Sequence, residues 1–386
     1  MTSETPSTAK RRPPIVVFSH LRWDFVWQRP QQLLSRLAKD RSIYFIEEPI
    51  FSDNAPLPPE GAHMEERHED GITVAHPVCR DPGPGEGWRL EQMYAHLVAG
   101  FVEQHKITGF TAWFYSPMFM PSLERIQPSL IVYDAMDELA LFKGAPPELL
   151  PREHALLERA DVVFTGGVSL GKAKAKLHAN VHAVPSGVDA QHYAQALSPD
   201  VRLPDDLAST PTPRAGYFGV IDERLDVALI GRAAELRPEV SFVMLGPIVK
   251  IDPAELPRPA NLHYLGSKQY KDLPAYVSGF DVCMMPFALN DATKFISPTK
   301  TLEYMAAHKP IVSTPVADVV GSYSEAVAIC ATPEEFVAAI DQALAETPEQ
   351  REKRVAREEE ILARNSWDTI AARMDEKMRE AESRRR

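Results

Sequence analysis

The segment of residues 281–314 constrains the fold of this chain most strongly, because it predicts a strand, a loop, a helix and another strand in close succession. Asp281 to Pro286 is an apolar run typical of a strand buried on both faces. Ser297 and Pro298 predict the helix start, since Ser is a favoured N-cap and Pro fits the first helical position. Pro310 ends the helix before the next apolar run. The segment is a βαβ unit with a long loop at the carboxyl end of its first strand, where open α/β sheets bind ligands.

The start of this helix also predicts a site for a nucleoside diphosphate. With Ser297 as N-cap, Lys300 is the third helical residue, where a cation opposes the helix dipole by roughly 0.3–1 kcal/mol. An anion held between Lys300 and the free N–H groups of Thr299 and Thr301 would reverse that sign. Glu303, one turn further on, could accept hydrogen bonds from two neighbouring sugar hydroxyls. The alternative, from these residues alone, is an ordinary capped helix with a solvated Lys–Glu surface.

The sequence SPTKTLEYMAAHKPIVST at 297–314 resembles the C-terminal signature of glycosyltransferases of family 4, which have the GT-B fold. The resemblance implies that the helix tip, residues 297–300, holds the diphosphate of a sugar nucleotide and that Glu303 holds its ribose. Members of this family often carry a second Glu eight residues earlier. This chain has Phe295 there, which departs from the family pattern at the usual donor-sugar contact.

The composition sets the class of protein. With 386 residues the chain has room for two domains, each with its own core. A net charge of −12 and the lack of a basic cluster inside the folded region argue against a nucleic-acid partner. Three cysteines without metal-like spacing fit a reducing compartment, and no apolar run approaches the ~20 residues that span a bilayer. Residues 1–14 lack the apolar segment of a signal peptide and are expected to be a disordered tail. We expect a cytoplasmic protein, with peripheral contact to the inner face of the membrane left open.

Long polar and aromatic side chains follow the first predicted strand, Ile15 to Ser19, at a place where a ligand would lie. The candidates on the acceptor side are Arg22, Trp23 and Asp24, and His20 is a candidate to hydrogen-bond a donor sugar. The alternative is a packed loop in which Trp23 and Trp27 anchor the core. The sequence IVVFSHLRWDFVWQRPQQLLSRLA at 15–38 resembles the start of a bacterial family 4 subgroup that includes teichuronic-acid biosynthesis glycosyltransferases.

Three carboxylates, Asp134, Asp137 and Glu138, follow the predicted strand 130–133. Like charges in a cleft raise one another's pKa, so this cluster is a candidate site; the alternative is acids at a helix N-terminus. YDAMDELALF at 133–142 also resembles a Tyr-Asp-x-x-Asp segment of the same subgroup. We predict that Asp137 acts in catalysis by orienting the acceptor or stabilising positive charge on the sugar, and that Asp134 lies on the acceptor side.

The second domain is expected to begin after a Pro-rich linker, residues 194–213. The preceding VPSGVD at 184–189 resembles the family segment that closes the first domain. After the strand 215–218, Gly219 permits a close approach of backbone to ligand, and the guanidinium of Arg224 could fork onto a phosphate. The resemblance implies that Arg224 stands at the Lys position of a diphosphate-gripping pair and Val220 at the Arg position, so that one cation is missing or supplied elsewhere.

Alternation of strands and helices, repeated on either side of one linker, predicts an α/β protein of two Rossmann-like, doubly wound parallel-sheet domains that face a cleft. The first domain is predicted at 15–193 and the second, nucleotide-sugar-binding domain at 214–365. A helix at 366–386 is expected to return to the first domain, as in the family.

The function predicted from this resemblance is transfer of a sugar from a nucleoside-diphosphate sugar to a saccharide or lipid-linked acceptor. Retention of configuration and a role in bacterial surface-polysaccharide or glycoconjugate synthesis are implied with it. No Asp-x-Asp pair is present to hold Mg²⁺, so neither a metal nor another cofactor is expected. A UDP-sugar is the first choice of donor. A nucleotide-sugar epimerase and a non-catalytic sugar-nucleotide-binding partner remain alternatives; the sugar and the oligomeric state are left open.

Overall fold

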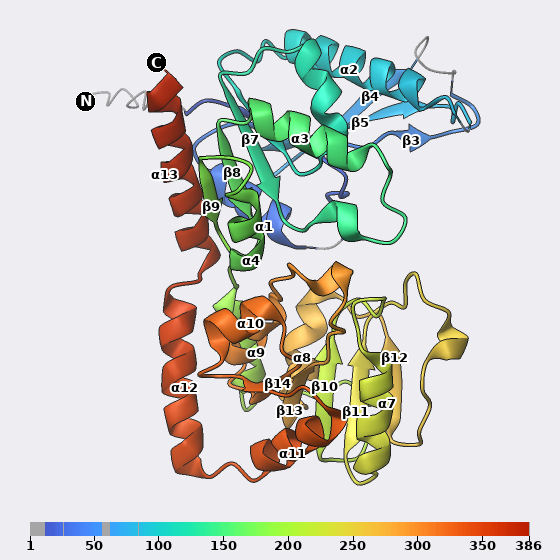
Figure 1. The fold of residues 1–386 in the computed structure, drawn as a ribbon, viewed down its shortest axis with the longest axis vertical. Coiled ribbons are helices and arrows are strands. Elements are labelled where there is room, and N and C mark those ends of the chain that lie inside the picture. Colours follow the sequence, from blue (N-terminus) through green and yellow to red (C-terminus); the bar gives the residue numbers. More distant parts are fainter. Residues whose placement is uncertain (1–11, 26, 56–61, 84, 386) are drawn as a thin grey trace, which may run out of the picture.

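Two α/β domains lie one above the other along the long axis of the molecule (Figure 1). The computed structural model describes residues 12–25, 27–55, 62–83 and 85–385, so most of the tail predicted at 1–14 lies outside the described residues. Each domain is built on its own sheet, and the strands of both sheets are parallel apart from one antiparallel edge. The predicted pair of doubly wound parallel sheets is therefore confirmed.

The first sheet has the strand order β3-β5-β2-β1-β6-β7-β8-β9 in the described part of the chain, with β4 paired antiparallel to β5. Its strands are β1 (Ile15–Ser19), β2 (Ile43–Glu47), β3 (Ile50–Phe51), β4 (His63–Glu69), β5 (Ile72–Cys79), β6 (Thr111–Phe114), β7 (Leu130–Ala135), β8 (Val162–Thr165) and β9 (Val181–Ala183). The helices around it are α1 (Arg29–Leu37), α2 (Gly87–Gln104), η1 (Pro117–Glu124), η2 (Leu139–Leu141), α3 (Leu149–Arg159) and α4 (Val168–Lys174).

The central strand β1 shows why this sheet forms. All five of its residues, 15–19, are buried, because helices cover both faces of a parallel sheet. Alternate side chains enter two different cores, one with Val16 and Phe18 and the other with Ile15 and Val17. The apolar run predicted for this strand is thus a consequence of burial on both sides.

The second sheet has the order β12-β11-β10-β13-β14-β15, and its described strands are all parallel. They are β10 (Arg214–Phe218), β11 (Ser241–Leu245), β12 (Leu262–Gly266), β13 (Val282–Met285), β14 (Ile311–Ser313) and β15 (Ala328–Ile329). The helices around it are α5 (Ala190–Ala194), η3 (Gln195–Leu197), α6 (Asp205–Ala208), α7 (Val227–Leu236), η4 (Pro253–Glu255), η5 (Tyr270–Asp272), α8 (Leu273–Ser278), η6 (Asp291–Thr293), α9 (Lys300–Ala306), α10 (Ala317–Tyr323), α11 (Pro333–Leu344) and α12 (Pro348–Ala363). The last helix, α13 (Trp367–Arg385), packs on the first domain. The segment 194–213, predicted as a linker, contains η3 and α6, and Leu207 of α6 lies in the second-domain core.

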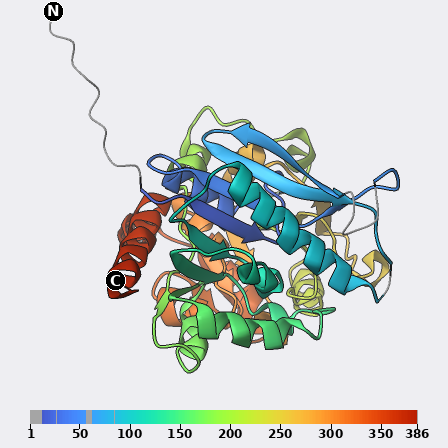
Figure 2. The same cartoon turned by 90° about the horizontal axis from the view of Figure 1, so that it is seen from above.

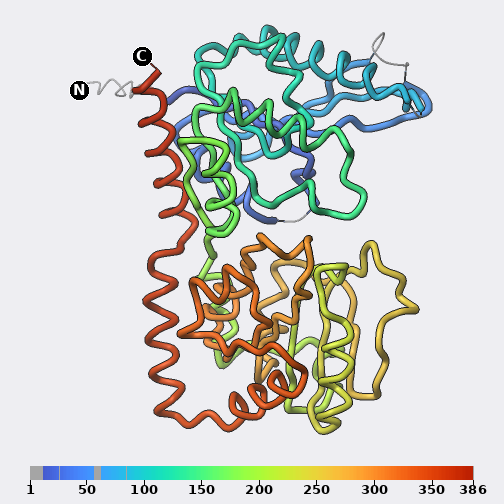
Figure 3. Tube along the Cα trace, viewed as in Figure 1, coloured from blue at the N-terminus to red at the C-terminus, as the bar shows by residue number. Residues whose placement is uncertain are grey.

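The chain passes between the domains twice on the same side of the molecule, before α5 and again between α12 and α13 (Figure 3). The two crossings touch: Val188 pairs with Ser366 in a parallel bridge, and the Val188 N–H donates to the Asn365 carbonyl at 2.9 Å. Gly187 is required here, since a Cβ at this position would lie 2.9 Å from the same carbonyl oxygen. The crossings therefore form one joint.

Helix α13 lies along one edge of the first domain (Figure 2), and its apolar face completes that domain's core. Trp367, Ile370, Met374 and Met378 are all buried there. Since α13 continues almost directly from α12, the C-terminal segment connects the second domain to the first.

The strand β4 has the polar sequence HMEERHE because it is an exposed edge strand. The structure differs from the sequence prediction at the start of α9. Helix α9 begins at Lys300 with Thr299 as its N-cap residue, so the prediction that Ser297 caps this helix is wrong. The backbone of 298–300 makes a turn before the helix, which shifts Lys300 from the third to the first helical position.

Candidate active site

A cavity of about 920 Å³ lies between the two domains, at the carboxyl ends of both sheets. The second domain contributes the loops after β10 and β11 and the start of α9, and the first domain contributes the loops after β1, β7 and β8. Of the residues predicted for the site, those lining it are Asp137, Gly219, Arg224, Ser297, Pro298, Thr299, Lys300 and Glu303. His20, Arg22, Trp23, Asp24 and Asp134 are not among its lining residues.

Lys300 presents a positive charge without a direct ion pair to this cavity. No salt bridge in the described part of the chain involves its ammonium, which lies 5.7 Å from the centre of the Phe218 ring. Burial lowers the pKa of Lys300, and Arg224 lowers it further, whereas Glu303 raises it. A cation in this setting is stabilised by an anion brought into the cavity.

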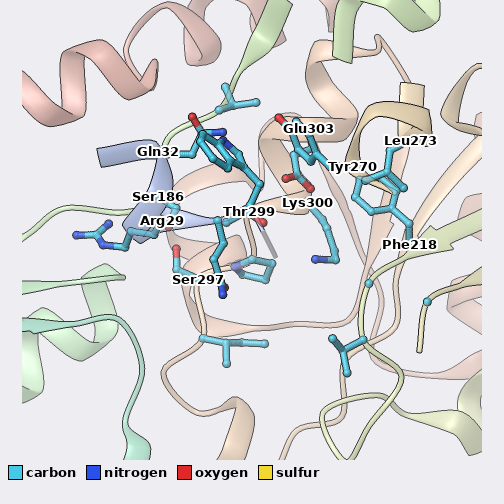
Figure 4. Close-up of a pocket in the computed structure, with 18 of the residues that line it drawn as sticks. Arg29, Gln32, Ser186, Phe218, Tyr270, Leu273, Ser297, Thr299, Lys300 and Glu303 are labelled. Atoms are coloured by element: carbon cyan, nitrogen blue, oxygen red, sulfur yellow. The ribbon is translucent and has the colours of Figure 1, made fainter. Parts of the chain in front are cut away.

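Glu303 lies one turn along α9, and Figure 4 shows its carboxylate and the Lys300 side chain directed into the same space. Its Oε2 atom is buried without a hydrogen-bond partner among the described residues. Burial raises the pKa of Glu303, and the charge of Lys300 opposes that shift. An unpartnered carboxylate oxygen in a cavity is ready to accept from ligand hydroxyls.

Gly219 and Gly246 allow the loops after β10 and β11 to close around Lys300. Both have φ in the left-handed half of the map, at +147° and +145°. A Cβ on Gly219 would lie 2.4 Å from Cε of Lys300, and one on Gly246 would lie 1.8 Å from the Gly219 carbonyl oxygen. The prediction that Gly219 serves close approach is consistent with this geometry, and Gly246 supports it from the neighbouring loop.

We expect Gly246→Ala to lower the free energy of unfolding by more than the roughly 1–3 kcal/mol that its backbone conformation alone costs a side-chain-bearing residue. The added Cβ meets backbone at Gly219, which cannot turn aside as a flexible lysine can. Gly219→Ala should cost less stability but should displace Lys300. Urea unfolding measures both, and Gly100→Ala, with open space around its Cβ on an exposed helix face, is the control. Equal losses for Gly246→Ala and Gly100→Ala would contradict this account.

The guanidinium of Arg224 donates hydrogen bonds to a neighbouring carboxylate. Its Nε donates to Asp222 Oδ1 at 2.9 Å and its Nη2 donates to Asp222 Oδ2 at 2.8 Å. Arg224 still lines the cavity, but it reaches a ligand only with donors that Asp222 leaves free. Val220, at the position where the family pattern has Arg, also lines the cavity and offers no charge.

The acidic cluster predicted after β7 is divided among different partners. Asp134 is fully buried, and its two oxygens accept from Arg29 Nε at 3.1 Å and Nη2 at 2.9 Å. Glu138 pairs with Lys174 at 2.7 Å. Asp137 alone lines the cavity, and burial raises its pKa while Arg224 and Arg29 lower it. The repulsion among the three carboxylates that the sequence predicted is not the main cause of the raised pKa of Asp137. Arg29 and Lys174 compensate the charges of Asp134 and Glu138.

In the loop after β1, the residues predicted to face the acceptor make contacts within the first domain instead. Arg22 donates to the carbonyls of Glu48 at 2.6 Å and Pro49 at 2.9 Å. Trp23 is buried in the first-domain core, as in the alternative prediction, and the exposed Asp24 pairs with Arg67 at 2.6 Å. Since these contacts bind the loop to its own domain, the structure gives Arg22, Trp23 and Asp24 no position in the cavity wall.

His20 follows β1 beside this loop. Its Nδ1 atom is buried and has no hydrogen-bond partner in the described ranges. Burial lowers the pKa of His20 to about 4, so the ring is neutral at pH 7. Its predicted contact with a donor sugar stays a prediction, because the residue lies outside the cavity lining.

Several lining residues were not predicted from the sequence. Phe25 and Trp27 are 71% and 42% exposed, so two aromatic faces stand at the cavity from the loop after β1. Arg29, whose side chain is buried, reaches the same cavity from the start of α1 (Figure 4). The dense aromatic content of 20–31 was the signal, but sequence spacing does not distinguish the buried Trp23 from the exposed Trp27.

Two residues of the second domain join it to the first beside the cavity. Phe295, at the position where the family pattern has Glu, is partly buried against the first-domain core. Asp318 of α10 accepts a hydrogen bond at 2.9 Å from the Ser169 N–H at the start of α4. Gly167 leaves room for this contact, since a Cβ there would lie 2.1 Å from Asp318 Oδ2. Phe295 therefore contributes to domain contact and not to the cavity wall.

Comparison with known proteins bears on the second domain most directly. Residues 213–346 match the family described as Glycosyl transferases group 1. The chain is 28% identical over 220 residues to TuaH of Bacillus subtilis (strain 168), whose name describes a glycosyltransferase of teichuronic acid biosynthesis. That alignment covers 52% of this chain and 54% of TuaH, so it spans about half the length of this curated relative.

Solved structures of glycosyltransferases share the fold of nearly the whole chain. A sucrose-phosphate synthase from Thermosynechococcus elongatus superposes with a TM-score of 0.69 at 17% identity, covering 97% of this chain and 100% of its own. A UDP-forming α,α-trehalose-phosphate synthase from Burkholderia vietnamiensis has a TM-score of 0.71 at 14% identity, with 96% and 99% covered. At such identities the likeness concerns the fold. The chain therefore has the GT-B fold, and its residues 213–346 match the Glycosyl transferases group 1 family.

Proposed function

We propose that this protein is a glycosyltransferase that moves a sugar from a nucleoside-diphosphate sugar to a saccharide or lipid-linked acceptor. The observation that carries the proposal is the pair formed by Lys300, a half-buried cation without an ion-pair partner in the described residues, and Glu303, with its unpartnered Oε2. The cation suits a diphosphate and the carboxylate suits the ribose hydroxyls. Both face one interdomain cavity large enough for a nucleotide sugar.

The chemistry follows from where charge develops. As the sugar carbon separates from the diphosphate, negative charge grows on the leaving oxygens, and Lys300 stabilises it more than it stabilises the bound donor. Arg224 adds positive potential from the next loop. Asp137 faces the cavity from the first domain, where its carboxylate orients the acceptor or stabilises positive charge at the sugar carbon. With retention, the departing phosphate oxygen takes the proton of the acceptor hydroxyl on the same face, so no side chain need act as base.

The relatives support the finer parts of the proposal. An E. coli structure described as trehalose-6-phosphate, with a TM-score of 0.69, is bound with UDP-2-fluoro glucose, which favours a UDP-sugar as the first donor to test. The name of TuaH favours a role in bacterial surface-polysaccharide synthesis. We propose that this role is carried out in the cytoplasm, at the inner membrane face when the acceptor is lipid-linked. In the described residues no helix is both long and apolar enough to span a bilayer.

A non-catalytic sugar-nucleotide-binding protein is the second candidate, because Phe295 replaces an acid of the family pattern and packs against the first domain. Incubation with UDP-sugars, with and without membrane lipid extract as acceptor, separates the candidates. Release of UDP that depends on the extract supports transfer, and conversion of the donor alone indicates an epimerase. Binding without either reaction indicates the non-catalytic role. A thermal-shift series with UDP, GDP, ADP and dTDP selects the base, since a ligand at 100 times its Kd adds about 2.7 kcal/mol of stability.

We expect EDTA to leave transfer intact. The positive charge that meets the diphosphate comes from Lys300 and Arg224, and no group of three or more metal-ligating side chains stands together in the described ranges. The measurement is the initial rate of UDP release after dialysis against EDTA, with a parallel sample given Mg²⁺ as control. Loss of transfer that added Mg²⁺ or Mn²⁺ restores would contradict a metal-independent mechanism.

A further inference from the structure

A second cavity, of about 360 Å³, lies within the first domain and plays no part in the site described above. It is lined by the chain after β2, by α2, by η1 and by α3. Its lining includes Glu48, Leu90, Tyr94, Met118, Phe119 and Arg152.

This cavity opens on the same edge of the first sheet as the interdomain cavity. Glu48 follows β2 and η1 follows β6, and these strands are the two neighbours of β1. The loop after β1 separates the two cavities, because Arg22 on that loop donates to the carbonyls of Glu48 and Pro49.

Two aromatic rings, Tyr94 and Phe119, line the second cavity, and the Tyr94 hydroxyl is a polar group without a partner there. Tyr94 is 5% exposed, and its hydroxyl has no hydrogen-bond partner among the described residues. The Tyr94 ring lies 5.0 Å from the ring of Phe119, and Leu90 and Met118 add apolar surface. A buried hydroxyl without a partner in a cavity indicates a ligand that supplies one.

The charges around this cavity disfavour the binding of a phosphate group. Its one basic side chain, Arg152, is already paired with Glu91 and donates to the Met118 carbonyl at 3.0 Å. Glu48 at the rim has no ion pair in the described part of the chain and adds a negative charge. A hydrocarbon chain would satisfy the apolar walls but would leave the buried Tyr94 hydroxyl without a partner. A neutral sugar ring satisfies both, since its C–H face packs on aromatic rings and its hydroxyls meet the phenol and the carboxylate.

We propose that this cavity binds a neutral sugar unit of the acceptor, remote from the unit that receives the transferred sugar. The proposal rests on the glycosyltransferase function above. It makes Tyr94 a specificity-determining residue, with Glu48 as a second polar contact.

The test uses the full chain and saturation-transfer NMR. The probes are the methyl glycosides of glucose, galactose, mannose and N-acetylglucosamine, with hexan-1-ol as the hydrocarbon probe and UDP titrated separately. We expect at least one glycoside to bind, and Tyr94→Phe, which removes only the hydroxyl, to raise its Kd roughly three- to tenfold. Tyr44→Phe is the matched control, because Tyr44 lies in the same domain outside both cavities.

Each remaining outcome overturns the proposal in a distinguishable way. Binding of no glycoside, or glycoside binding that Tyr94→Phe leaves unchanged, removes the sugar site while intact UDP binding keeps the proposed function. Binding of hexan-1-ol alone assigns the cavity to a hydrocarbon. Glycoside binding in a protein that binds no nucleotide removes the acceptor role together with the proposed function.

Discussion

Replacing Lys300 by Met is expected to weaken binding of UDP by roughly ten- to 150-fold while the affinity for uridine changes little. Loss of a hydrogen bond to a charged group costs about 1.5–3 kcal/mol, which gives this range. Lys300 has no ion-pair partner in the described residues, so its charge is free for the diphosphate. Met keeps the apolar stem beside Gly219 and removes only the charge. Titration calorimetry with UDP and uridine measures both affinities.

The pH dependence of UDP binding gives a second readout for Lys300. Burial lowers its pKa in the free protein, and a bound diphosphate raises it again. Binding should therefore take up protons, and the affinity for UDP should fall as the pH rises through the lowered pKa. Lys294→Met is the control, because Lys294 is exposed and outside the cavity lining. Equal losses for UDP and uridine in Lys300→Met would mean that this residue acts through the fold.

Asp137→Asn is expected to lower turnover by roughly 100-fold or more, the scale of losing one electrostatic contact to a transition state. Of the three acids after β7, Asp137 alone lines the cavity, whereas Asp134 and Glu138 are held by cations. The affinity for UDP should stay within a few-fold, since the nucleotide is held by the other domain. Initial rates of UDP release and UDP calorimetry on the same preparation measure the two effects.

Stability separates a functional from a structural role for Asp137. Burial raises its pKa above the unfolded value, so the native state binds the proton more tightly than the unfolded state. The free energy of unfolding therefore falls as the pH rises through the raised pKa, and at pH 7 the ionised carboxylate costs stability. The Asn variant should melt at the same or a higher temperature than the natural protein. Lower turnover together with a lower melting temperature would assign Asp137 a structural role, and Asp24→Asn, exposed and outside the cavity, controls for the loss of a charge.

Much of the second-domain side of the cavity could be predicted from the sequence because its signals are local. Gly219, Lys300 and Glu303 each follow a short apolar run, and parallel strands bring their carboxyl ends to one edge. The spacing of Lys300 and Glu303 within one helix turn places both on the same face wherever the helix begins. This is why the two-residue error in the start of α9 did not displace either residue from the cavity.

The sequence by itself determined the two parallel-sheet domains, since apolar runs that alternate with amphipathic helices can be buried in few other ways. Only the tertiary structure decided which charges are free. Asp134 meets Arg29 across 105 positions and Arg224 meets Asp222 across two, while Lys300 meets no carboxylate within ion-pair distance in the described residues. Only the structure showed that Trp23 is buried whereas Trp27 is exposed, and that Tyr94 lines a second cavity. The physical reason is that periodicity reports which face of an element is buried, whereas the partner of a polar group depends on chain segments that only folding brings together.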